Sequence, residues 1–132
     1  MDFHGAKLAL FLGDRLLVIR RDDFPGLPWP GHLDFPGGGR EGAESPEDCA
    51  LRETFEEVGL RLGPGDLTGG RVHRGTGRPT WFFVAHLPAE AEARIRFGDE
   101  GQGWHLMPPA DYLAHPLRIP HLALLLAEVL TG

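Results

Sequence analysis

The chain has 132 residues, a formal net charge of −6 and a single cysteine. This length fits one domain over residues 1–132, and the negative charge disfavours a nucleic-acid-binding surface, which is typically basic. One cysteine excludes an intramolecular disulfide and favours a reducing cytoplasm, and neither a charged-then-apolar leader nor an apolar run of membrane-spanning length is found, so we expect no membrane association.

The first third of the chain predicts two strands followed by a loop. Apolar residues dominate Lys7–Phe11 and Leu16–Arg20, and Gly13-Asp14 supplies a turn between them. The segment Asp22–Pro36 is rich in proline and glycine, which is typical of a loop.

A helix is predicted from Pro46 to Val58. Ser45 followed by Asp48 is close to a capping box, and proline suits the first helical position. Gly59 suits a left-handed stop after the last turn.

The predicted helix has two distinct faces. At about 100° per residue, one arc is expected to face the core: Leu51, Thr54, Phe55 and Val58. The opposite arc carries carboxylates at the spacing of helical neighbours, and it is flanked by the small Cys49 and Ala50: Glu53, Glu56 and Glu57. Such like charges repel each other unless a cation binds them, and all-oxygen ligands suit Mg²⁺ or Mn²⁺. A solvated acidic face is the alternative interpretation.

These carboxylates belong to a longer pattern with fixed spacing, whose members are Gly38, Glu44, Arg52-Glu53, Glu56-Glu57 and Gly59-Leu60. The pattern resembles the signature of the Nudix hydrolases, and it departs from that signature only at Thr54, where the family has an aliphatic residue. The resemblance implies an α/β fold of the Nudix type, an α/β/α sandwich with a mixed β-sheet. It also implies a hydrolase acting on phosphorus-containing acid anhydrides.

The resemblance assigns roles to individual residues. It implies that Mg²⁺, with Mn²⁺ as a substitute, is bound by the side chains of Glu53, Glu56 and Glu57 with a backbone carbonyl near Gly38. Arg52, one turn before Glu56, is expected to hold the carboxylates in place. Glu44 is expected to support the metal ligands or the loop.

The remaining chain predicts a hairpin, two short strands and a terminal helix. The expected strands are Gly70–Arg74 and Thr80–Leu87, joined around Gly75-Thr76-Gly77, followed by Ala93–Phe97 and Trp104–Met107. The expected helical segments are a brief turn over Ala110–Leu113 and a helix over Pro120–Leu130.

The acidic, glycine-containing loop between the last two strands carries Glu100, our candidate for the base that accepts a proton from the attacking water. Asp99 and Glu57 are alternatives for this role, and a polar turn is the structural interpretation of the same loop. The catalytic residues expected together are therefore Arg52, Glu53, Glu57 and Glu100.

Substrate contacts are predicted at Arg40, Trp29 and Gly38. Trp29 precedes the glycine run, Gly37-Gly38-Gly39. An aromatic ring at this place can stack on a base, although packing is the commoner role of tryptophan. Arg40 can pair with a phosphate, and the same chemistry is available to Arg20, Arg21, Arg74 and Arg78.

The resemblance implies a small-molecule nucleotide as substrate. The proline and the tyrosine that two Nudix subgroups carry about fifteen residues past the signature are missing: Gly75 stands at that place, and Tyr112 is the only tyrosine. This favours a nucleoside triphosphate pyrophosphohydrolase over a hydrolase of nucleotide sugars or dinucleotides. A noncatalytic nucleotide sensor is the rival from another class, and a homodimer is expected because many relatives are dimers.

Overall fold

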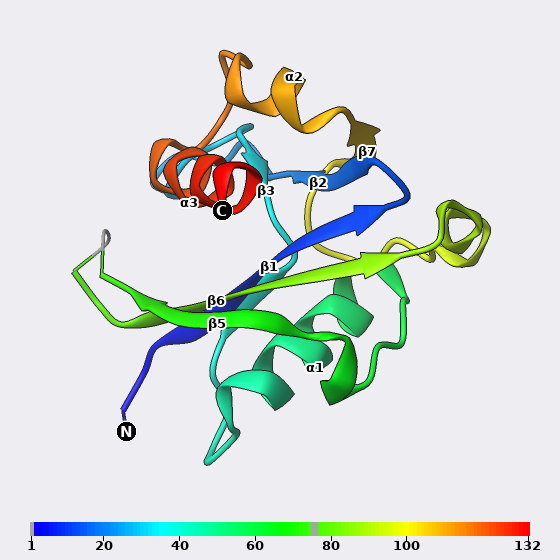
Figure 1. Cartoon of the computed structure of the whole chain (residues 1–132). Coiled ribbons are helices and arrows are strands. Elements are labelled where there is room, and N and C mark those ends of the chain that lie inside the picture. The colour runs from blue at the N-terminus through cyan, green and yellow to red at the C-terminus, as the bar shows by residue number, and fades with distance from the viewer. Residues whose placement is uncertain (1, 75–76) are drawn as a thin grey trace.

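A mixed β-sheet forms the centre of the molecule in the computed structural model, which describes residues 2–74 and 77–132 (Figure 1). Strand β1 (Gly5–Leu12) runs parallel to β6 (Thr80–Leu87) and antiparallel to β2 (Arg15–Arg20), as the turn at Gly13 predicted. Strand β5 (Thr68–His73) pairs antiparallel with β6, which confirms the predicted hairpin, whose Gly75 and Thr76 lie outside the described residues. The sheet is completed by antiparallel pairs of β3 (Leu33–Asp34) and β7 (Gly103–Met107) with β2, and of β4 (Gly37–Gly39) with β1.

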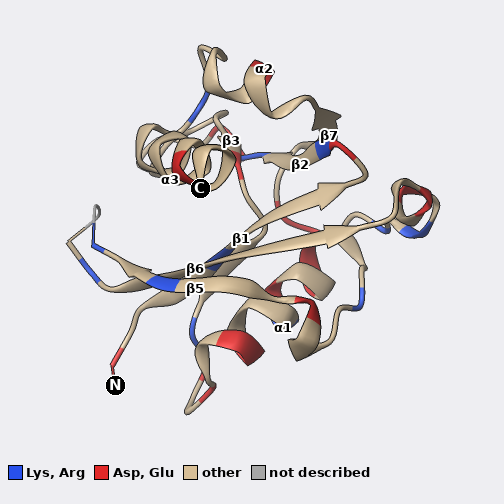
Figure 2. Cartoon of the chain, viewed as in Figure 1, with Lys and Arg blue, Asp and Glu red and all other residues tan. Residues whose placement is uncertain are grey.

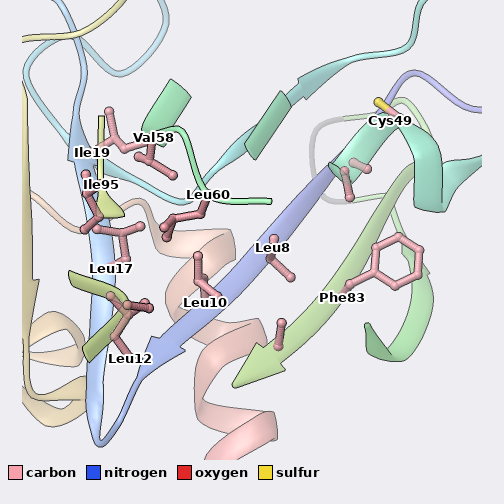
Figure 3. Close-up of a cluster of buried hydrophobic side chains, with 14 of the residues drawn as sticks. Leu8, Leu10, Leu12, Leu17, Ile19, Cys49, Val58, Leu60, Phe83 and Ile95 are labelled. Carbon is pink, nitrogen blue, oxygen red and sulfur yellow. The ribbon is translucent and has the colours of Figure 1, made fainter. Parts of the chain in front are cut away.

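Helices cover both faces of this sheet, with α1 (Pro46–Val58) on one side and α3 (Pro120–Thr131) on the other (Figure 1). Because neighbouring residues of a strand point to opposite faces, each central strand contributes to two cores. On β1, Leu8 and Leu10 pack in the core that includes α1 residues, while Phe11 packs in the core that includes α3 residues. Figure 3 shows the first of these cores. The predicted α/β/α sandwich with a mixed sheet is therefore confirmed.

Helix α1 begins and ends where its sequence signals predicted. The side chain of Ser45 accepts a hydrogen bond from the Asp48 amide at 3.1 Å, and proline occupies the first turn. Gly59 closes the helix at φ 73°, and its amide donates to the Phe55 carbonyl at 2.8 Å. Local capping chemistry was sufficient to define this element.

The buried face of α1 differs from the predicted arc. Thr54 and Val58 are buried as expected, but Phe55 is 40 % exposed and packs under the Arg61 guanidinium. The buried residues at the start of the helix are instead Cys49 and Ala50, predicted to flank an open acidic arc. These small side chains let the helix approach the sheet closely. Glu53 and Glu57 follow Ala50 by one and two turns, so they lie beside the core instead of opposite to it.

The predicted strand Ala93–Phe97 is wrong. The chain forms a 3-10 helix there, η2 (Ala89–Arg94), followed by an irregular segment. The amides of Arg96 and Gly98 donate to the Val58 and Glu57 carbonyls at 2.8 and 2.9 Å. The last carbonyls of α1 lack partners within the helix. Because they accept these amides, the amides are not available for pairing with a strand.

The other elements lie close to their predicted positions. The segment expected to be a loop before the glycine run contains β3, and a short 3-10 helix, η1 (Pro64–Asp66), precedes β5. Helix α2 (Pro109–Leu113) carries Tyr112, whose buried hydroxyl donates to the Leu33 carbonyl at 2.8 Å and accepts from the Ile119 amide at 3.0 Å. These bonds tie the segment before α3 to β3. No helix in the described part of the chain combines the length and the apolar character needed to cross a bilayer.

Thr54, the one departure from the family signature, leaves a polar atom in the core. Its side chain is fully buried, and its hydroxyl has no hydrogen-bond partner among residues 2–74 and 77–132. Burying a hydroxyl without a partner costs free energy. We therefore expect Thr54→Val to raise the free energy of unfolding by about 1 kcal/mol, measured by urea denaturation. The exposed Thr131→Val serves as the control, and a destabilised Thr54→Val would contradict this account.

Candidate active site

Arg52 joins the glycine run to helix α1. Its Nε donates to Glu44 Oε2 at 2.6 Å, and its Nη2 donates to the Gly39 carbonyl at 2.8 Å. The expected pair with Glu56 is present, with Nη1 at 3.0 Å from Oε1. Hydrogen bonds from Arg52 hold the pKa of Glu44 below its ordinary value. Glu44 thus stays ionised and keeps the guanidinium in a fixed orientation.

The acidic face of α1 lies directly against strand β4. Glu57 Oε1 accepts a hydrogen bond from the Gly37 amide at 2.8 Å. A side chain at Gly38 would meet the carboxylate of Glu53, so the glycine leaves room for this carboxylate beside the strand. The helix and the glycine run therefore form one unit, held through both backbone and side chains.

Burial has a strong effect on two of these carboxylates. It raises the pKa of Glu57 to about 8, although Lys7 and the Gly37 amide act in the opposite direction. Burial also raises the pKa of Glu53 above its ordinary value. Taking a carboxylate out of water is unfavourable unless a positive charge compensates it. These residues therefore suit a nearby cation.

A pocket of about 290 Å³, which we call the acidic pocket, opens between the end of α1 and the loop after η2; its walls are Glu53, Glu56, Glu57, Gly98, Asp99 and Glu100. The structure thus brings Glu100 together with the three glutamates of the helix. At the start of the loop, the Gly98 amide donates a hydrogen bond to the Glu57 carbonyl. On its second side the Gly101 amide donates to Asp22 Oδ2 at 3.0 Å.

The donor set of the acidic pocket fits a hard divalent cation. Its carboxylates are oxygen ligands, which Mg²⁺ and Mn²⁺ prefer, whereas Gly38 lies outside the lining of this pocket and its carbonyl faces Cys49 Sγ at 3.6 Å. Among the residues that the structure describes, no three histidine, cysteine, aspartate or glutamate side chains already stand close enough to hold an ion. Side-chain rotation of the glutamates into the pocket would therefore accompany binding. Cys49 is not a further ligand candidate, because burial raises the pKa of its thiol to about 11.

The sequence interpretation missed an ion cluster beside the glycine run. Buried Asp34 pairs with Lys7 at 2.9 Å and with Arg21 at 2.8 Å. Burial alone would raise the pKa of Asp34, but these two cations hold it below its ordinary value. A signal was present in the sequence, since Lys7 is the only charged residue of the apolar strand β1.

A second pocket, the apolar pocket, has a volume of about 350 Å³ and lies between the sheet and α3; its walls include Trp29, Trp81, Phe82, Ile119, Leu122 and Leu125. Lys7, Arg21 and Asp34 line it as well. Trp29 is 40 % exposed and has φ 49°, a conformation that only a few per cent of non-glycine residues adopt. Its indole ring lies 6.5 Å from the His121 ring.

The predicted substrate contacts occupy different places. Trp29 and Gly38 line the apolar pocket. Arg40 lines neither this pocket nor the acidic pocket. Its Nε donates to the Glu44 carbonyl at 2.9 Å, and its guanidinium lies 4.3 Å from the Phe3 ring centroid. Its present contacts support the loop before α1. Figure 2 shows how acidic residues of α1 and basic residues of the sheet are distributed around the site.

Comparison with known proteins agrees with this geometry. The family model described as NUDIX domain matches residues 3–127. An RNA pyrophosphohydrolase of Gluconobacter oxydans is 32 % identical over 123 residues, covering 77 % of this chain and 69 % of the relative. An RNA pyrophosphohydrolase of Gluconacetobacter diazotrophicus is 36 % identical over 106 residues, covering 76 % of this chain and 57 % of the relative. This chain therefore corresponds to only part of these proteins.

The fold has close counterparts among solved structures. The structure of a C. elegans Ap4A hydrolase binary complex superimposes with a TM-score of 0.75 over 96 % of each chain, at 19 % identity. This likeness concerns the fold. The family match and the pyrophosphohydrolase relatives support the predicted enzyme class, a hydrolase of pyrophosphate bonds. With its signature, its sandwich fold and a family match over nearly all of its length, the chain belongs to the NUDIX domain family.

Proposed function

We propose that this chain hydrolyses a phosphoanhydride bond in a nucleoside triphosphate, with Mg²⁺ or, as a substitute, Mn²⁺. The observation that carries the proposal is a row of three adjacent pockets that share wall residues. The acidic pocket shares Glu57 and Glu100 with a smaller middle pocket of about 100 Å³. The middle pocket shares Arg21 and Asp34 with the apolar pocket. A nucleotide presents the same order of chemistry, from charged phosphates to an apolar base.

The proposed metal ligands are the side chains of Glu53, Glu56 and Glu57 with the carbonyl of Gly38. A divalent cation held by these residues would supply positive charge for the phosphates and would activate a water for attack. Arg52 holds Glu56 and the glycine run in position. Glu100 lines the same pocket, which supports its proposed role as the base that accepts the proton of the attacking water.

The rest of the site binds and orients the nucleotide. Lys7 and Arg21 lie between the acidic and apolar ends, where their charges favour a phosphate chain. Trp29 supplies a flat ring at the apolar end, and stacking on a base suits its exposed position. The exposed tryptophan favours substrates that carry a base.

The substrate alternatives are nucleotide sugars, dinucleotides and the 5′ ends of RNA, the last suggested by the names of the two curated relatives. A nucleotide sensor is disfavoured because a noncatalytic protein would not need the metal-binding glutamates, and this chain keeps all of them. Incubating the protein with Mg²⁺ and each substrate class, and identifying products by mass spectrometry, separates these possibilities. Binding of ATP without turnover would favour the sensor. A homodimer and a cytoplasmic location stay predictions.

Removing the charge of either Glu53 or Glu57, which are partly buried, should abolish most turnover while preserving the fold. We expect Glu53→Gln and Glu57→Gln each to lower kcat by about 100-fold or more, because a neutral amide binds a divalent cation poorly. Phosphate and pyrophosphate release at saturating Mg²⁺ measures this loss, with circular dichroism as the test of folding. Glu47→Gln, on the exposed first turn of α1, is the matched control. Near-native rates in both variants would refute the assigned ligands.

Magnesium should stabilise the protein more at high pH than at low pH. Between pH 4.5 and about 8, the range between the ordinary and the folded pKa of Glu57, the folded metal-free chain keeps a proton that the unfolded chain has lost. Its stability therefore falls as pH rises through this window. Magnesium needs the ionised carboxylate, so its benefit grows over the same window.

Thermal unfolding with EDTA or Mg²⁺ at pH 6 and pH 8.5 measures this linkage. At a Mg²⁺ concentration ten times its Kd, we expect a gain of about 1.4 kcal/mol at the higher pH. The gain should be smaller at pH 6 and in Glu57→Gln. Equal gains under all of these conditions would contradict the assignment of Glu57 as a ligand.

The role of Glu100 can be separated from metal binding. We expect Glu100→Gln to lower kcat by about 100-fold, the usual scale for a general base, with little change in KM. Asp99→Asn is the control, because Asp99 lines the same pocket. A larger loss in Asp99→Asn would move the role to Asp99. Unchanged kinetics in both would leave Glu57 as the base.

A further inference from the structure

We propose that Asp22 is a positioning residue for Glu100, because its carboxylate fixes the peptide bond that follows Glu100 in the chain. The inference rests on the proposed function, in which Glu100 is the base. Asp22 Oδ2 accepts a hydrogen bond from the Gly101 amide at 3.0 Å, across 79 positions of the sequence. The sequence interpretation placed Asp22 only at the start of a loop, and the fold gives it this second role.

The loop that carries Glu100 bridges the end of α1 and the end of β2. At its start, the Gly98 amide donates to the Glu57 carbonyl at 2.9 Å. Asp99 and Glu100 follow, and both are exposed. An exposed side chain takes little orientation from packing, whereas a catalytic group needs a support that holds it in the productive geometry. The direction of Glu100 therefore depends on how its backbone is held.

Three hydrogen bonds hold the second half of this loop on the end of β2 and the two residues after it. The Gln102 amide donates to the Arg20 carbonyl, and the Gln102 side chain donates to the Arg21 carbonyl, both at 2.8 Å. The third bond is the one from the Gly101 amide to Asp22. Of these three, only the third is accepted by a side chain, so a substitution can remove it and leave the other two in place.

The third bond acts directly on Glu100. The Gly101 N–H lies in the same peptide plane as the carbonyl of Glu100, so a partner for this N–H also orients the backbone of Glu100. A carboxylate acceptor makes such a bond stronger than a neutral one. Gly101 has φ 94°, and a Cβ built there would lie 3.0 Å from the Arg20 carbonyl oxygen. The loop thus turns in close contact with β2, and without Asp22 this peptide plane, and Glu100 with it, would be free to rotate.

Asp22 also lines the middle pocket, together with Glu57 and Glu100. A carboxylate there that contacted the attacking water would be a rival base instead of a positioning residue. The two roles are separable by substitution with asparagine. The amide oxygen of asparagine still accepts a hydrogen bond from Gly101, but an amide does not take a proton from water.

Steady-state kinetics with ATP and Mg²⁺ compare Asp22→Ala with Asp22→Asn. We expect Asp22→Ala to lower kcat about tenfold, because the base is retained but poorly oriented, and Asp22→Asn to restore most of the rate. KM should stay near the wild-type value in both variants. The reason is that the Asp22 carbonyl, which accepts from the Gly31 amide at 3.1 Å and holds the loop of Trp29, is unchanged. Asp23→Ala, at the exposed neighbouring position, is the matched control.

A double-mutant cycle with Glu100→Gln separates positioning of Glu100 from a general effect on the fold. If Asp22 acts through Glu100, Asp22→Ala causes no further loss of kcat in the Glu100→Gln background. The same loss in both backgrounds would overturn the inference. An unchanged kcat in Asp22→Ala, or a loss in Asp22→Asn as large as that in Asp22→Ala, would overturn it as well.

Failure of the proposed function has a different result. It fails if ATP is not hydrolysed, or if Glu100→Gln leaves kcat unchanged. Hydrogen exchange of the Gly101 amide, followed by NMR, then decides the inference alone. Asp22→Ala should speed this exchange about tenfold, while the Gly98 amide, which is bonded to Glu57, serves as the unchanged internal reference. Unaltered exchange at Gly101 would overturn the inference.

Discussion

The candidate site depends on how closely helix α1 approaches the glycine run. Two small side chains, Cys49 and Ala50, are fully buried at the start of the helix. They allow the Gly37 amide to reach Glu57 and the backbone at Gly38 to touch Glu53. Bulkier side chains at Cys49 and Ala50 would push the helix away from the core against which it packs. The close approach that forms the core also forms the site.

This approach creates an electrostatic conflict that the fold only partly resolves. Arg52 compensates Glu44 and Glu56 at the outer edge, and Lys7 with Arg21 compensates Asp34 at the inner edge. Between these edges, burial raises the pKa of Glu53 and Glu57. Functional sites commonly store such unfavourable desolvation, and here either a proton or a bound cation would relieve it. These uncompensated carboxylates lie where the phosphates of the proposed substrate would be bound.

The sequence predicted the features that depend on local chemistry. The bounds of α1 follow from Ser45 and Gly59, which act within one turn of the helix. Features that depend on distant partners were missed or wrong. Phe55 was placed in the core because periodicity alone does not say which neighbouring arc meets the sheet. The predicted strand over Ala93–Phe97 is wrong because the Arg96 amide, and the Gly98 amide just after the range, donate to carbonyls of α1. Lys7 and Asp34, 27 residues apart, meet only in the folded chain.

Net charge was the least informative property of the sequence, because the molecule separates its charges in space. Acidic residues gather around Glu53 and Glu57 in the acidic pocket, whereas Arg71 and Arg74 line a pocket between β5 and α3 together with Glu128. A purely acidic cleft would repel a polyanion along its whole length. Lys7 and Arg21 line the apolar pocket, so positive charge lies next to the acidic end, where it favours a bound anion. The average of −6 therefore hides a separation of charge along this side of the molecule.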